Sequence, residues 1–83
     1  MNQRVSVLID NGATHNFIDA HLVQRRVIPT DTFEGFSFLV PEDRTMQCMH
    51  YVPSLSVTMG SYTFVDHLFV VDIPDTNVIL GVQ

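Results

Sequence analysis

The tripeptide Asp10-Asn11-Gly12 separates two apolar segments near the start of the chain and restricts how the chain can fold. The preceding run, residues 5–9, is apolar and rich in β-branched residues, so it predicts a strand, and Asn-Gly marks a turn directly after it. A carboxylate at the end of a buried strand is poorly tolerated unless it pairs, accepts hydrogen bonds or shifts its pKa. Asp10 is therefore the first candidate for a catalytic residue.

The same tripeptide has a purely structural interpretation. Asn-Gly is the preferred pair for a type I′ hairpin turn, which would join the strand 5–9 directly to the apolar segment 14–18. On the tripeptide alone the hairpin is the better interpretation. The catalytic interpretation depends on the rest of the chain.

The chain has 83 residues, enough for one small domain spanning 1–83. A domain of this size buries only about 60–65% of its unfolded surface, so its core needs additional support. Cys48 is the only cysteine, which excludes an intramolecular disulfide, and the spacing of the four histidines matches no familiar zinc pattern. We therefore expect support from oligomerisation, with no metal and no cofactor.

Charge and hydropathy restrict the partners. The net charge is −5 and no basic patch is present, so direct binding of nucleic acid by this segment is not expected. No apolar stretch reaches the length of about 18 residues that a membrane span needs, and the first residues do not resemble a signal peptide. With a single unpaired thiol, the sequence predicts an intracellular location.

Most of the chain is predicted to be strand. The one convincing helix covers 20–26, with Asp19 as its N-cap residue and two arginines in its last turn. Strands are expected at 36–40, 45–52, 55–59, 62–71 and 78–80, with a turn at 41–44, an interruption at Pro53 and a loop at 72–77. The strand 62–71 is apolar on both faces and is expected to be covered on both. These elements predict an all-β fold with one short helix and a closed or rolled sheet.

Two ordered motifs resemble a known family. The segment 7–18, Val-Leu-Ile-Asp-Asn-Gly-Ala-Thr-His-Asn-Phe-Ile, resembles the active-site segment of retropepsin-type aspartic proteases, especially those of plant Ty3/gypsy retrotransposons. The segment 77–81, Asn-Val-Ile-Leu-Gly, resembles the second motif of that family. The resemblance implies a small retropepsin-type β-barrel and an intracellular or retroelement-particle location.

The resemblance also implies roles for individual residues. Asp10 would be the catalytic residue, and a homodimer would complete the site because aspartic proteolysis needs two carboxylates that share one proton. The substrate would be an extended segment of a polyprotein. The remaining positions that the family pattern assigns are the active-site loop Asn11, Gly12 and Ala13, the flap over the substrate cleft at Val40, Pro41, Glu42, Asp43, Arg44 and Thr45, and the supporting strand at Ile79, Leu80 and Gly81.

Two departures from the family pattern leave a second hypothesis open. Asn11 stands where the family has Ser or Thr, and the chain ends at Gln83 without the family's C-terminal helix and dimer strand. The alternative is therefore a catalytically impaired retropepsin fold that acts as a dimerisation or peptide-binding module. A third hypothesis is a small monomeric β-domain with an ordinary hairpin.

Overall fold

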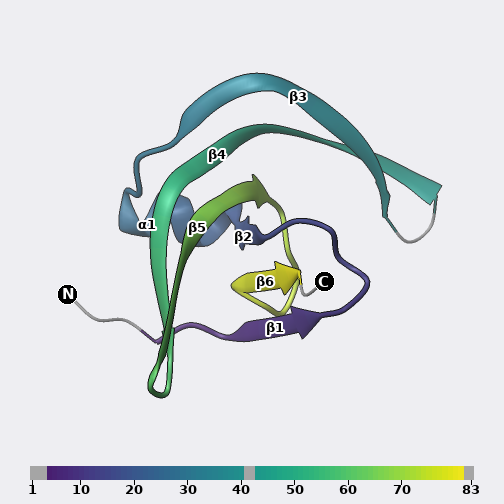
Figure 1. Cartoon of the computed structure of the whole chain (residues 1–83). Coiled ribbons are helices and arrows are strands. Elements are labelled where there is room, and N and C mark those ends of the chain that lie inside the picture. The colour runs from purple at the N-terminus through teal and green to yellow at the C-terminus, as the bar shows by residue number, and fades with distance from the viewer. Residues whose placement is uncertain (1–3, 41–42, 82–83) are drawn as a thin grey trace.

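The protein is a mainly β domain with one short helix, as predicted (Figure 1). The structure, a computed structural model, describes residues 4–40 and 43–81. In chain order the elements are β1 (Val7–Asp10), β2 (Phe17–Asp19), α1 (Ala20–Arg26), β3 (Asp31–Val40), β4 (Arg44–Met59), β5 (Tyr62–Val71) and β6 (Val78–Gly81).

The strands form one sheet in the order β1-β6-β2-β5-β4-β3. The β1–β6 and β2–β5 pairs are parallel and the other pairs are antiparallel. Among the described residues β1 and β3 end the sheet and do not pair with each other, so the sheet is curved but not closed. Figure 1 shows the β3–β4 hairpin arching over the shorter strands.

The hairpin interpretation of Asp10-Asn11-Gly12 is wrong. β1 pairs with β6, a strand from the far end of the chain, and not with β2. A type I′ turn needs positive φ at both central residues. The described residues with positive φ are Val27, Gly35, Asp43, Gly60 and Asp75, so neither Asn11 nor Gly12 adopts that conformation.

β1 is not the buried strand that its apolar sequence suggested. Leu8 is 49% exposed and Ile9 is 53% exposed. The cause is the position of β1 at the edge of the sheet, where a strand has a neighbour on one side only. The apolar run at 5–9 correctly predicted a strand but did not distinguish an edge strand from a central one.

The helix α1 begins and ends where the sequence predicted, but Asp19 does not cap it through its side chain. Asp19 is buried, and its Oδ1 accepts the Ile73 N–H at 2.9 Å. The Asp19 N–H donates to the Asn77 carbonyl at 2.8 Å, so this residue attaches the start of α1 to the loop before β6. No helix in the described part of the chain is long and apolar enough to cross a membrane.

Two further expectations about strands were wrong. β4 continues through Pro53 as one strand, and the register with β5 shifts between Val52 and Leu55. A bulge of this kind accommodates a proline inside a strand. β5 is buried mainly in its second half, from Leu68 onward, because its first half extends with β4 into a protruding hairpin (Figure 1).

The side chains pack in two groups. The aliphatic core consists of Ile18, Leu22, Val23, Val52, Leu68, Val78 and Leu80. A second group of half-buried rings surrounds Phe69, whose ring centroid lies 5.1 Å from that of Phe36 and 5.3 Å from that of His15. The His15 side chain is itself exposed and packs against the edge of this half-buried group.

Cys48 is fully buried between neighbouring strands. Its Sγ–H lies 3.4 Å from the His50 carbonyl and 3.5 Å from the Val70 carbonyl. Burial raises the pKa of the Cys48 thiol above its ordinary value, because the thiolate loses solvation inside the protein. The buried thiol therefore packs as part of the interior of the sheet.

The raised pKa of Cys48 predicts that its thiol reacts slowly in the folded protein. We expect a thiol reagent to label Cys48 much more slowly than it labels the unfolded chain, because the thiolate is the reactive form. The folded protein also keeps the thiol proton to higher pH than the unfolded chain, whose thiol ionises at a pH of about 8.5. The contribution of Cys48 to the free energy of unfolding therefore falls as the pH rises above that value. Labelling rates with and without denaturant test the first point, and urea melts of the protein and of Cys48→Ala across pH 7–10 test the second.

Candidate active site

Asp10 lies at the end of β1 on a loop that fixes its side chain. Asp10 Oδ1 accepts the Gly12 N–H at 2.8 Å, and the Asp10 carbonyl accepts the Ala13 N–H at 3.2 Å. Asp10 is half-buried, and no cationic side chain of the described residues forms a salt bridge with it. The loop therefore presents an oriented carboxylate whose charge no neighbouring base neutralises.

The predicted supporting strand lies directly beside this loop. Ile79, Leu80 and Gly81 pair in parallel with Leu8, Ile9 and Asp10. Leu80 is buried in the aliphatic core. A Cβ atom at Gly81 would lie 2.6 Å from the Ala13 carbonyl oxygen and 2.8 Å from the His15 carbonyl oxygen. Only glycine permits this close approach of strand and loop.

Asn16 connects the loop to two strands, a role that the sequence reasoning missed. Its Oδ1 accepts the Gly81 N–H at 2.9 Å, its Nδ2 donates to Asp66 Oδ2 at 3.3 Å, and its carbonyl accepts the Phe69 N–H at 2.9 Å. Asp66 is thus partnered within the chain. The only sequence signal for Asn16 was its place in the first motif.

A second set of hydrogen bonds fixes the start of β1. Asn77 Oδ1 accepts the Ser6 N–H at 2.8 Å, and the Ser6 carbonyl accepts the Val78 N–H at 3.1 Å. Asn77 of the second motif therefore ties the start of β1 to β6, whereas Asn16 of the first motif ties the loop after β1 to the end of β6. The Asp10 strand is therefore fixed at both ends.

The predicted flap is a real hairpin, although part of its tip lies outside the described residues. Val40 pairs with Arg44 and Leu39 with Thr45, and Asp43 has a left-handed φ of 56°. Pro41 and Glu42 fall outside the described range. Figure 1 shows the hairpin reaching out over the side of the molecule on which the β1–β2 connection lies. Contact of residues 40–45 with a substrate stays a prediction.

Asn11 is exposed at the tip of the Asp10 loop. Within the described chain its side chain makes no hydrogen bond, whereas its neighbours Asp10 and Gly12 are bonded to each other. An amide offers two donors and one acceptor oxygen. Asn11 is therefore available to a group that approaches the loop from outside.

One group of side chains has the donors of a metal site. His21 Nδ1 lies 3.6 Å from Asp19 Oδ1 and 3.6 Å from Asp72 Oδ1. Carboxylate and imidazole ligands suit divalent ions. However, the group belongs neither to the Asp10 loop nor to the flap hairpin, and Asp19 Oδ1 already accepts a backbone N–H. We assign no metal to it.

The comparison with protein families gives a match over the part of the chain that forms this site. The model of the retroviral aspartyl protease family matches residues 1–83. That range includes the Asp10 loop and the β6 strand that supports it. Comparison with curated proteins and with solved structures gave no match.

Proposed function

This chain belongs to the retroviral aspartyl protease family, and from that premise we propose that two copies of it form an aspartic endopeptidase. The observation that carries the proposal is the Asp10 loop. It holds one half-buried carboxylate, oriented by the Gly12 N–H and supported from below by Gly81. In the proposal this loop supplies one half of an aspartic protease site, that is, one of the two carboxylates that the reaction needs.

Dimerisation supplies the missing half. In a two-fold symmetric dimer the same surface of each subunit meets its copy, so Asp10 of one subunit would face Asp10 of the other across the axis. Like charges about 3 Å apart cannot both ionise, so the pair would share one proton and titrate as a unit. Asn11, exposed beside each Asp10, would lie at the same interface.

The two carboxylates would then divide the chemistry. The ionised carboxylate takes a proton from a water molecule, which attacks the scissile carbonyl carbon, while the protonated carboxylate polarises the carbonyl oxygen. The carboxyl group that took the proton from water then gives it to the leaving amine as the C–N bond breaks. The Gly12 N–H orients Asp10 before substrate arrives, and such preorganisation accelerates the reaction.

The substrate proposed is an extended segment of a retroelement polyprotein. The β3–β4 hairpin has the form of a flap, and such a hairpin can close over an extended peptide and pair with its main chain. Origin in a Ty3/gypsy-type element of plants, and action inside the cell or the retroelement particle, belong to the same proposal. They are supported by the residues that follow Gly12.

The alternative function is a catalytically impaired module that keeps the fold for dimerisation or peptide binding. The observation that favours it is Asn11, which stands where the family has a hydroxyl residue. An amide is longer and planar, so the hydrogen bonds across the axis must rearrange. A misplacement of about 1 Å at a catalytic site can cost about 100-fold in rate.

The Asn11→Ser variant separates the two functions. If the chain is a working protease, we expect the parent to cleave an apolar peptide library at pH 4–6 and the variant to cleave it up to about 100-fold faster, because the hydroxyl restores the shorter hydrogen bonds. Product formation by mass spectrometry measures both rates. Asn11→Ala is the matched control, since it shortens the side chain without adding a hydroxyl. An inert parent that the serine activates would favour the impaired module.

Sedimentation velocity tests the dimer independently of activity. We expect a concentration-dependent dimer that a pepstatin-type inhibitor stabilises, because the inhibitor contacts both subunits. A protein that stays monomeric at high concentration, with and without inhibitor, would contradict the proposed site.

A further inference from the structure

Asp66 is the only acidic residue of β5, and hydrogen bonds fix both of its carboxylate oxygens. Its Oδ1 accepts the His67 N–H at 2.8 Å, and His67 Nδ1 lies 3.7 Å from the same oxygen. Its Oδ2 accepts a hydrogen bond from Asn16 Nδ2 at 3.3 Å. Because the backbone of the next residue holds one oxygen, the other oxygen stays directed at Asn16.

This contact determines which way the Asn16 amide points. Asn16 Oδ1 accepts the Gly81 N–H at 2.9 Å, so the amide must present its oxygen to Gly81 and its nitrogen to the opposite side. An ionised carboxylate accepts hydrogen bonds and cannot donate them, so beside Asp66 it favours the amide nitrogen. A flipped amide would place Nδ2 against the Gly81 N–H and its oxygen against the carboxylate. Asp66 therefore favours the one orientation of Asn16 that holds Gly81.

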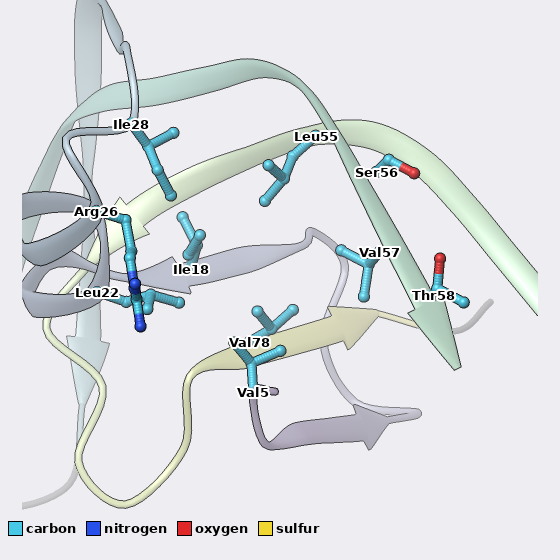
Figure 2. Close-up of a pocket in the computed structure, with 10 residues that line it drawn as sticks. All are labelled: Val5, Ile18, Leu22, Arg26, Ile28, Leu55, Ser56, Val57, Thr58 and Val78. Atoms are coloured by element: carbon cyan, nitrogen blue, oxygen red, sulfur yellow. The ribbon is translucent and has the colours of Figure 1, made fainter. Parts of the chain in front are cut away.

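The two ends of β6 are held in different ways. At its start, Val78 pairs with Ile18 of β2, and Figure 2 shows both side chains among those that line a cavity of about 580 Å³. Both residues belong to the aliphatic core, so side-chain packing holds this end. Gly81, at the other end, has no side chain. Hydrogen bonds to its backbone must therefore hold the end of β6 that lies beside the active-site loop.

The position of Gly81 in turn affects that of the Asp10 loop. Gly81 is the register partner of Asp10 in the parallel β1–β6 pair. It also lies so close to the loop that an added Cβ would be 2.6 Å from the Ala13 carbonyl oxygen. A series of direct contacts therefore runs from β5 through Asn16 and Gly81 to Asp10.

We propose that Asp66 is a positioning residue for the Asp10 carboxylate. It acts through Asn16, whose amide it orients, and Asn16 in turn holds the end of β6 against the active-site loop. An effect of Asp66 on cleavage rests on the proposed protease function. An effect on the loop does not, because the Gly12 N–H donates to Asp10 Oδ1 and its exchange with solvent reports on that bond directly.

An exchange of the two side chains tests this proposal. Asp66→Asn leaves one oxygen for two donors, the Asn16 amide and the His67 N–H, so one hydrogen bond must be lost. Adding Asn16→Asp restores every bond with the polarity reversed. The new carboxylate at position 16 accepts from Gly81 and from the new amide at position 66, whose oxygen accepts the His67 N–H. We therefore expect the single variant to be impaired and the double variant to recover.

Amide hydrogen exchange, followed by NMR at pH 6, measures the loop without any substrate. In Asp66→Asn the Gly81 N–H should exchange about three- to tenfold faster, as expected for the loss of one hydrogen bond, and the Gly12 N–H should also exchange faster. Both rates should return to those of the parent in the double variant. Neither glycine is next to an altered residue, so their intrinsic exchange rates do not change. Asp31→Asn, an exposed change on β3, is the matched control and should alter neither rate.

Peptide cleavage gives the second measurement, at pH 6 and at equal dimer concentration. Asp66→Asn should lower kcat at least about tenfold and change KM less than about threefold, because Asp66 acts on the catalytic carboxylate and not on substrate binding. The double variant should recover kcat. In an Asn16→Ala background, Asp66→Asn should have no further effect, since the residue through which it acts is gone. Thermal melting verifies that each variant is folded at the temperature of the assay.

Three results would overturn the proposal. Unchanged exchange of the Gly81 and Gly12 amides in Asp66→Asn would mean that Asp66 does not orient Asn16. A double variant that folds but does not recover would assign the effect to the contact with His67, which the exchange of side chains does not restore. Altered exchange with an unchanged kcat would make the contact structural alone. A parent that does not cleave counts against the protease function instead, and the Gly12 amide then decides whether Asp66 positions Asp10.

Discussion

The Asp10→Asn variant is expected to lose peptide-bond hydrolysis while keeping its fold. An amide cannot exchange the proton that the pair of carboxylates must share, so neither subunit can act as the base or as the acid. General acid–base catalysis contributes about 10²–10⁴-fold to a rate, and both roles are lost together in the homodimer. We therefore expect the cleavage rate to fall by at least about 10³-fold.

The fold should survive because an Asn at position 10 keeps the side-chain oxygen that accepts the hydrogen bond of the loop. Asp10 Oδ1 accepts the Gly12 N–H at 2.8 Å, and the Asn side-chain carbonyl can accept the same bond. Circular dichroism and thermal melting should therefore match those of the parent.

A control variant separates this effect from a general loss of charge. Asp75→Asn changes an exposed aspartate with φ of 64°, a conformation that Asn tolerates well, and it should leave the rate unchanged. The measurement is the initial rate of cleavage at pH 4–6 for parent and both variants at equal dimer concentration. Activity that persists in Asp10→Asn would refute the mechanism.

Local signals in the sequence predicted the elements, but not all of their neighbours. The start of the helix was predicted from Asp19 as N-cap residue and its end from the arginines in the last turn, which are properties of a short window. The strand that pairs with β1 could not be predicted from such a window. Only the family motif near Gly81 indicated it, because a strand sequence does not record which distant strand completes its hydrogen bonds.

The errors have the same origin. Asp19 was expected to cap α1 because caps are local, but the distant Ile73 N–H occupies its carboxylate. Pro53 was expected to end a strand, but a bulge against β5 accommodates it. The role of Asn16 was missed because it consists of hydrogen bonds to Gly81 and Asp66, which are far away in the chain. Each depends on tertiary contacts that no short window contains.

The second large effect is expected for Gly81→Ala, which places a methyl group between β6 and the active-site loop. The new Cβ would lie 2.6 Å from the Ala13 carbonyl oxygen and 2.8 Å from that of His15. Both are backbone atoms, so no side chain can rotate away, and the loop itself must move. Overpacking of this kind costs about 1–3 kcal/mol of stability.

The movement should affect catalysis more than stability. Gly81 pairs in register with Asp10, and its N–H donates to Asn16 Oδ1, so a shift of the loop also moves the carboxylate. A displacement of about 1 Å at the reacting groups costs about 100-fold in rate. We expect kcat to fall by about that factor at a temperature where the variant is still folded.

Gly60→Ala is the matched control for this prediction. Gly60 has φ of 61°, so alanine there is strained by about 1–2 kcal/mol, yet no atom lies within 4 Å of its added Cβ. Both variants should therefore melt at lower temperature than the parent, and only Gly81→Ala should lose kcat. If the two variants lose stability equally and both keep the parent's kcat, then the contact of β6 with the loop does not position Asp10, and the support assigned to Gly81 is structural alone.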